Sequence, residues 1–189
     1  MALSLPIGTA ANDLLSRSPL ALLIGMVLDQ QVTMEKAFSS PYELQQRLGR
    51  DLDARELADF DPDELTAIFS RPPALHRFPK ANAKRVQEVC RVLVDRYEAD
   101  AARLWKEAKT GAELYQRVSA LPGFGQQKTQ IFVALLGKRF NVRPKGWREA
   151  AGRYGEDGVH YSVADIVDDD SLDLVRTYKR EMKAAAKAG

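Results

Sequence analysis

The 189-residue chain has one cysteine, two histidines and almost no net charge, and each shortage excludes a class of protein. A single cysteine, Cys90, forms no disulfide within the chain and cannot supply the thiolates of an iron–sulfur cluster or structural zinc site. The two histidines lie far apart in the sequence, which leaves little for a histidine-based metal site. The net charge of +2 is not the bulk basic character of many nucleic-acid-binding proteins, so such a site must come from local clusters.

The sequence also lacks a signal peptide, a membrane-spanning run and β-type alternation. No apolar run approaches about 18 residues, so we expect a cytoplasmic protein with no membrane contact. Runs that alternate with period two are nearly absent, which predicts an all-α fold. Hydrophobic residues at 45% and charged residues at 29% are typical of a globular protein with ample material for one core.

Helical patterns separated by breaks extend along most of the chain. The most apolar stretch, 19–32, predicts a buried helix with Ser18 as its cap and Pro19 in its first turn. Pro41 is expected to open the next helix. The predicted helices after 19–32 are 41–48, 54–59, 62–69, 80–97, 110–120, 126–140 and 171–188.

A short glycine hairpin, Leu-Pro-Gly-Phe-Gly-Gln-Gln-Lys-Thr at 121–129, joins two of these predicted helices. Because glycine accepts positive φ angles, we expect Gly123 and Gly125 to turn the chain sharply. The turn leaves backbone N–H groups unpaired at the start of the next helix, where the helix dipole also favours negative charge. With Lys128 one turn in, this pattern predicts a phosphate site. The alternative is a tight helix corner in which Gly125 permits close packing.

A polar triplet, Asp29-Gln30-Gln31, ends the most apolar helix. Polar groups in such a place are costly unless they find partners. The two amides could cap the helix end from within. Alternatively they project into a cleft and replace base-pair hydrogen bonds in a distorted duplex, which the paired donor and acceptor of an amide suit well.

Two basic clusters lie before and after the hairpin. The first surrounds Phe78 and the second follows the hairpin helix; their members are His76, Arg77, Lys80, Lys84 and Arg85, and then Lys138, Arg139, Arg143, Lys145 and Arg148. A charge run is usually a solvated face. Lys80, Lys84 and Arg85 nevertheless share the first turns of one predicted helix, where they could follow a phosphate backbone. Together with the hairpin, the clusters favour a nucleic-acid groove.

Three of these features, in this order, resemble the helix-hairpin-helix (HhH-GPD) DNA glycosylases, the superfamily of endonuclease III and the adenine-specific mismatch glycosylase. They are the apolar helix ending in Gln30-Gln31, the basic helix after Phe78-Pro79-Lys80, and the hairpin before its apolar helix. The chain is also similar to an iron–sulfur-free subgroup described as base-excision repair proteins. The resemblance covers about 20–146. It implies one two-lobed, all-α HhH-GPD-like domain over 1–189, with the helix-hairpin-helix motif at about 110–140.

The resemblance implies a base-excision DNA repair protein, nucleoid-associated in the cytoplasm, that excises or recognises a base flipped into a pocket between the lobes. Its partner is double-stranded DNA with a damaged or mispaired base. We expect no cofactor and no iron–sulfur cluster, although a monovalent cation could bind at the hairpin. The DNA-binding residues that the resemblance implies are Gly123, Phe124, Gly125, Gln127, Lys128, Gln30, Gln31, Arg77, Lys80, Lys84 and Arg85.

The chain departs from the family pattern where the family carries its catalytic aspartate, about twenty residues after the hairpin and just before a glycine. Lys145 stands there, and no carboxylate occurs between Lys128 and Glu149. A cation opposes the positive charge that develops on the sugar as the glycosidic bond breaks. The family's bifunctional lyases also carry a lysine two residues after the second glycine, where this chain has Gln127.

Three hypotheses follow from this departure. In the first, the chain is a divergent glycosylase that recruits its acid from Glu149, Asp157 or Asp29. In the second, Lys145 is the nucleophile and attacks the sugar through a Schiff base. In the third, the fold keeps DNA binding without catalysis and recognises lesions. Lys145 and Glu149 are the candidate catalytic residues. A protein-interaction adaptor that uses the helix at 171–187 is the hypothesis from a different class.

Overall fold

The computed structural model describes residues 3–188, which form α-helices and two short 3-10 turns and contain no β-strand. The all-α prediction is confirmed. The elements are α1 (Thr9–Arg17), α2 (Pro19–Leu28), α3 (Met34–Leu48), α4 (Ala54–Asp59), α5 (Pro62–Ser70), α6 (Pro79–Tyr97), α7 (Arg103–Lys106), α8 (Gly111–Ser119), α9 (Gln126–Arg139), α10 (Trp147–Ala151), η1 (Gly152–Gly155), η2 (Val163–Asp165) and α11 (Asp169–Ala188).

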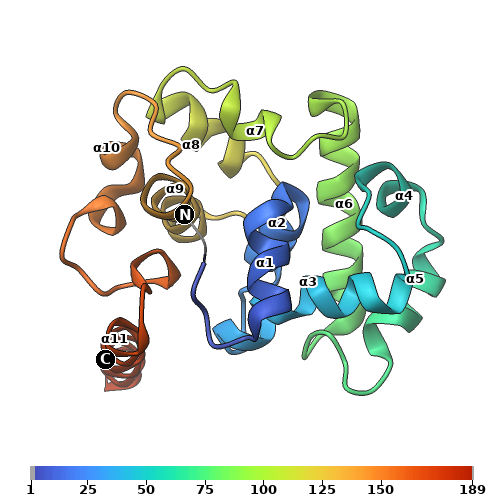
Figure 1. The fold of residues 1–189 in the computed structure, drawn as a ribbon, viewed down its shortest axis with the longest axis horizontal. Coiled ribbons are helices and arrows are strands. Elements are labelled where there is room, and N and C mark those ends of the chain that lie inside the picture. The colour runs from blue at the N-terminus through green and yellow to red at the C-terminus, as the bar shows by residue number, and fades with distance from the viewer. Residues whose placement is uncertain (1–2, 189) are drawn as a thin grey trace.

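Two groups of helices lie on either side of α2 (Figure 1). On one side, α3 packs against α2, and α4 and α5 pack against the long helix α6. On the other side, α8, α10 and the two 3-10 turns pack around α9. The hairpin that joins α8 to α9 therefore belongs to the second group, while the polar triplet after α2 and the basic start of α6 belong to the first.

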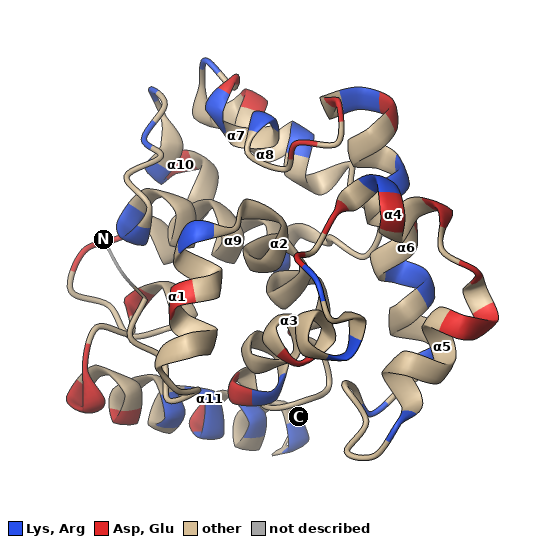
Figure 2. Ribbon diagram, turned by 45° about the vertical axis from the view of Figure 1, so that its right-hand side comes forward, with Lys and Arg blue, Asp and Glu red and all other residues tan. Residues whose placement is uncertain are grey.

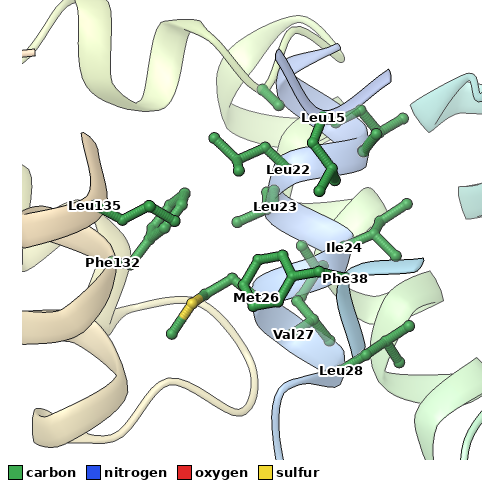
Figure 3. Packing of buried hydrophobic residues seen from close by; sticks show 14 of the residues in the cluster. Leu15, Leu22, Leu23, Ile24, Met26, Val27, Leu28, Phe38, Phe132 and Leu135 are labelled. Carbon is green, nitrogen blue, oxygen red and sulfur yellow. The ribbon is translucent and has the colours of Figure 1, made fainter. Parts of the chain in front are cut away.

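Helix α2 is the centre of the core, and every residue of it from Leu20 to Leu28 is buried. A helix that is apolar on all sides needs protein on all sides. Side chains of α2 point towards α9 on one side, where Phe132 and Leu135 lie, and towards Phe38 of α3 on another (Figure 3). Ser18 caps α2 as expected, since its hydroxyl accepts a hydrogen bond from the Ala21 N–H at 3.2 Å.

The helix ends at Leu28, four residues before the end of the apolar stretch 19–32. Asp29 leaves the helical conformation and Gln31 takes a φ of +58°. A left-handed residue cannot continue a right-handed helix. The triplet Asp29-Gln30-Gln31 thus forms a turn that presents its groups outside the helix end.

The expectation that Pro41 opens a helix is wrong, because α3 begins at Met34 and contains Pro41. Thr33 is the cap that sequence reasoning missed, and its hydroxyl accepts a hydrogen bond from the Lys36 N–H at 3.2 Å. A proline inside a helix removes one backbone hydrogen bond. The neighbouring Ser40 hydroxyl bonds to the carbonyl oxygens of Lys36 and Leu75, which ties this part of α3 to the loop before α6.

Most other predicted helices agree with the structure within one or two residues, whereas α1, α7, α10 and the 3-10 turns were not predicted. Among residues 3–188, no single helix is long and apolar enough to cross a membrane. Helices α1 and α2 pass that test only as a pair bent by 112°, and most of α2 is buried in the core.

Candidate nucleic-acid interface

The hairpin turns at Gly123, which has a φ of +83°. Gly125 differs from the expectation, since its φ of −80° is open to any residue. A Cβ atom at Gly123 would lie 2.5 Å from Cδ of Arg85, so this glycine also permits close contact with α6. Between the glycines, Phe124 turns inwards and packs on Phe132 with ring centroids 6.0 Å apart. Only the backbone of Phe124 is therefore available to a ligand at the hairpin.

The start of α9 has the form expected of an anion site. Its N-cap is Gly125, which has no side chain to cap the first N–H groups of the helix. Nothing lies within 4 Å of the position that a Cβ atom would take at Gly125. Gly125, Gln126 and Gln127 are all exposed. A phosphate can thus approach these N–H groups, where the helix dipole favours it.

The side chain of Lys128, predicted as a cation of the phosphate site, turns towards the end of α2. Its Nζ donates a hydrogen bond to the carbonyl oxygen of Val27 at 3.0 Å and lies 5.8 Å from the centroid of the Phe124 ring. The ammonium thereby meets the negative end of the α2 dipole. Burial lowers the pKa of Lys128 to about 8; Asp29 opposes this shift and Arg85 adds to it. The structure therefore places Lys128 on the inner side of the hairpin, against the end of α2.

A carboxyl group accompanies Lys128 at this point. Asp29 is the C-terminal cap of α2 and is half-buried. Burial raises the pKa of the Asp29 carboxyl, Glu35 adds to the rise, and the charges of Lys179 and Lys128 oppose it. Asp29 is one of the three carboxylates that the sequence offers as a recruited acid, and the structure puts it within electrostatic reach of Lys128.

Gln30 connects the residues that were predicted to bind DNA in the two helix groups. Arg85 of α6 lies against Gly123 and donates a hydrogen bond from Nη1 to Oε1 of Gln30 at 3.3 Å. His76 contacts the backbone carbonyl of Gln30 through Nε2 at 2.9 Å. Gln31 is exposed next to them. The hairpin, the end of α2 and the start of α6 thus form one continuous site.

His76 is a buried part of this site and does not belong to the exposed basic cluster. Its side chain is only 2% exposed. Nδ1 accepts a hydrogen bond from the Phe78 N–H at 3.0 Å and contacts Nδ2 of Asn82 at 2.9 Å. This arrangement assigns the proton to Nε2, which donates to Gln30. Burial lowers the pKa of His76, and the charges of Lys128 and Arg85 lower it further.

Three other cations of the first basic cluster are exposed, as predicted. Lys80 and Lys84 lie in the first two turns of α6, and Lys84 pairs with Glu88 at 3.8 Å. Arg77 stacks 5.4 Å from the centroid of Phe78, which is itself 43% exposed. Arg77, Lys80 and Lys84 form an exposed basic rim around the buried contacts of His76 and Arg85.

Most cations of the second basic cluster are bound to carboxylates or carbonyl oxygens of the protein, contrary to the expectation of a second DNA surface. Lys138 pairs with Asp165 at 2.6 Å, and both side chains are mostly buried. Arg143 donates to the Gly137 carbonyl oxygen at 2.9 Å. Arg148 contacts the Gly155 carbonyl oxygen at 2.7 Å and Asp157 at 2.9 Å. These cations hold the chain after α9 in place.

Lys145 and Glu149 lie together in a different place. They line a cavity of about 640 Å³ with Gln126 and Gln130 of α9. The carbonyl oxygen of Lys145 accepts a hydrogen bond from the Gly111 N–H at 2.8 Å, and its side chain is exposed. At about 100° per residue, Gln126 and Gln130 are on the side of α9 opposite to Lys128. The two predicted catalytic residues are thus close to each other but separated from the site at Asp29 and Lys128.

Two contacts near the site had little signal in the sequence. Gln127 donates a hydrogen bond to the Tyr154 hydroxyl at 2.9 Å, which links the hairpin helix to η1. Lys179 of α11 acts on Asp29 from a segment 150 residues away. No local pattern along 171–188 indicates that this helix returns to the end of α2.

A glycine hairpin between two helices, joined to the ends of an apolar and a basic helix, defines an all-α helix-hairpin-helix protein. The chain belongs to the HhH-GPD superfamily of base excision DNA repair proteins, whose family model matches residues 24–185. That range begins within α2 and extends into α11. Comparisons with curated proteins and with solved structures gave no match.

Proposed function

We propose that this HhH-GPD protein binds duplex DNA through its hairpin and removes a damaged or mispaired base, with Lys128 and Asp29 as the reacting groups. One observation supports this most strongly. The Lys128 ammonium, with a pKa of about 8, and the half-buried Asp29 carboxyl both lie where the exposed hairpin joins the end of α2, and each charge acts on the pKa of the other. Perturbed groups gathered next to a binding element are typical of functional sites.

DNA binding is supported by the open start of α9 and by the basic rim. The N–H groups after Gly125 can hold one phosphate, and Arg77, Lys80 and Lys84 can hold others along the same strand. These contacts do not depend on sequence, so they position the protein on the duplex. Gln30 and Gln31 then lie beside the opened base pair, where their amides can replace lost hydrogen bonds.

The chemistry follows from the pKa of Lys128. At pH 7 about one molecule in ten has a neutral amine, far more than for an ordinary lysine. The lone pair of Nζ attacks C1′ of the sugar, and the electrons of the glycosidic bond leave with the base, which takes up a proton. The proton lost from Nζ passes to the carboxylate of Asp29. Asp29 then returns this proton to O4′ as the C1′–O4′ bond breaks, and the opened sugar is joined to Lys128 as a Schiff base.

Lys145 and Glu149 remain the alternative location of this chemistry, and a lesion-recognition module without catalysis remains the alternative function. The cavity that the two residues share with Gln126 and Gln130 is large enough to admit small groups. One experiment distinguishes the proposal from both alternatives, because each of them predicts a different result.

The experiment traps Schiff bases with borohydride on duplexes that carry an abasic site or one of a panel of damaged bases, and measures base release separately. We expect an adduct with the unmodified protein, its loss in Lys128→Gln and its persistence in Lys145→Gln. Loss in Lys145→Gln alone would move the chemistry to the cavity at Glu149. Tight binding of lesions without adduct or base release would replace the proposal with the recognition module.

A further inference from the structure

Helix α11 is attached to the rest of the protein by its first half only. Leu172 and Val175 are buried, and the Tyr178 ring packs on Tyr161 with centroids 4.6 Å apart. Every residue from Lys179 to Ala188 is exposed. The second half of the helix therefore has its side chains in solvent, and Figure 2 shows the helix running along the lower edge of the molecule.

A stripe of cations, which we call the α11 stripe, begins near the end of the attached half and continues along the exposed half; it consists of Arg176, Lys179, Arg180, Lys183 and Lys187. At about 100° per residue these five side chains fall within an arc of about 100°. Glu181, the one carboxylate between Arg176 and Lys187, projects about 140° away from Arg176. Basic residues at a helix C-terminus are common because of the dipole, but that effect is limited to the last turn. The stripe begins three turns before the end.

The stripe faces a groove. Two cavities of about 1060 Å³ and 480 Å³ lie between α11 and the turn after α2, and both are lined by Val32 and Thr33. Five cations and two carboxylates line them: Arg77, Arg176, Lys179, Arg180 and Lys183, with Glu35 and Asp173. Arg176 pairs with both carboxylates, at 2.6 Å and 3.6 Å.

The groove leads to the site described above. Arg77, from the basic rim of α6, and Lys183, from the α11 stripe, line the same cavity with Gln31. Lys179 is close enough to Asp29 to act on its pKa. A continuous series of cations thus runs from the start of α6, past the polar triplet, to the free half of α11.

We propose that the α11 stripe binds the phosphate backbone of DNA, so that the duplex is held on two sides of Gln30-Gln31, by the hairpin and by α11. This inference rests on the proposed DNA binding. Arg176 to Lys187 spans about 16 Å, which is the rise of about five base pairs. A membrane surface is a poorer match, because the tail of α11 beyond Lys183 offers only alanines and lysine to a lipid interface.

The test compares the salt dependence of duplex binding in matched variants. The triple variant Lys179→Gln, Arg180→Gln, Lys183→Gln leaves the Arg176 contacts intact. Each lost phosphate contact lowers the slope of log affinity against log salt by about 0.9, so we expect a reduction of about 2 to 3. The control triple variant, Arg96→Gln, Lys106→Gln, Lys109→Gln, has the same change in charge at exposed positions outside the groove and should keep the slope.

A second measurement uses the inert cysteine. Burial raises the pKa of the Cys90 thiol to about 12, so it does not compete for labelling. A photo-crosslinker attached at Lys183→Cys should join the DNA within a few nucleotides of a defined lesion, and one attached at Lys106→Cys should not.

The outcomes separate this inference from the proposed function. No binding of duplex DNA by the unmodified protein at low salt would refute both. Binding that is lost in a hairpin variant, with an unchanged slope in the α11 triple variant and no crosslink from Lys183→Cys, would refute the α11 inference alone. An acidic protein as the partner of the stripe would give that second result.

Discussion

Nζ of Lys128 lies 3.0 Å from the carbonyl oxygen of Val27, a contact between residues 101 apart in the sequence. The contact joins the first turn of the hairpin helix to the last turn of the most buried helix. It also turns the lysine away from the phosphate position and into the site with Asp29. In the proposed function, this residue reacts with the sugar, whereas the sequence suggests it as a phosphate ligand.

Gly125→Asp should separate DNA binding from folding. The φ of −80° and the open space around the missing Cβ allow any side chain, and aspartate is a better N-cap than glycine by a few tenths of a kcal/mol. The added carboxylate nevertheless repels a phosphate at the same N–H groups. We expect an unchanged or slightly raised Tm and a loss of duplex affinity of about tenfold or more. Gly125→Asn, a neutral cap, is the control, and an equal loss in both variants would show that access and not charge matters.

Gly123→Ala should destabilise the protein by about 1–2 kcal/mol in denaturant unfolding. The φ of +83° strains any side chain, and the new Cβ atom would lie 2.5 Å from Cδ of Arg85. The double variant Gly123→Ala, Arg85→Ala should recover the part of the lost stability that comes from the contact with Arg85. No recovery would mean that backbone strain accounts for the whole loss.

The rate of Schiff-base trapping should rise with pH through about 8 and then level off, because only the neutral amine of Lys128 attacks. Lys128→Arg keeps the charge and the hydrogen-bond donor but has no nucleophile at these pH values. It should bind duplex DNA within about threefold of the unmodified protein and form no adduct. A trapping rate independent of pH between 6 and 9 would contradict the assignment.

The protein should lose stability in mild acid because of His76. Burial lowers the pKa of His76 in the folded protein below the value of 6.5 for an unperturbed side chain. Between that value and the lowered one, the unfolded chain binds a proton that the folded protein does not, so the free energy of unfolding falls as pH falls. In His76→Gln this part of the pH dependence should be absent. If the two unfolding profiles stay parallel between pH 7 and pH 5, His76 is not the group responsible.

The sequence predicted the fold better than the orientation of the site residues. The long helices and the hairpin follow from local patterns of apolar residues, caps and glycines, which is why α2, α6 and α9 were predicted nearly in full. Pro41 was misplaced because Thr33, a cap eight residues earlier, decides where α3 begins.

The direction of the Lys128 side chain depends on its hydrogen bond to the Val27 carbonyl oxygen at the end of α2. No local sequence pattern predicts that contact. The same holds for the second basic cluster. Lys138 and Arg148 look like a solvated basic surface in sequence, but Asp165 and Asp157 hold them after the chain folds back. Lys179 likewise reaches Asp29 only through the return of α11.

The most direct test of the central claim is to identify the amino acid joined to DNA after borohydride reduction, by proteolysis and mass spectrometry of the adduct peptide. The account predicts that Lys128 carries the sugar remnant. A remnant on Lys145, or base release with no adduct under any condition, would contradict it.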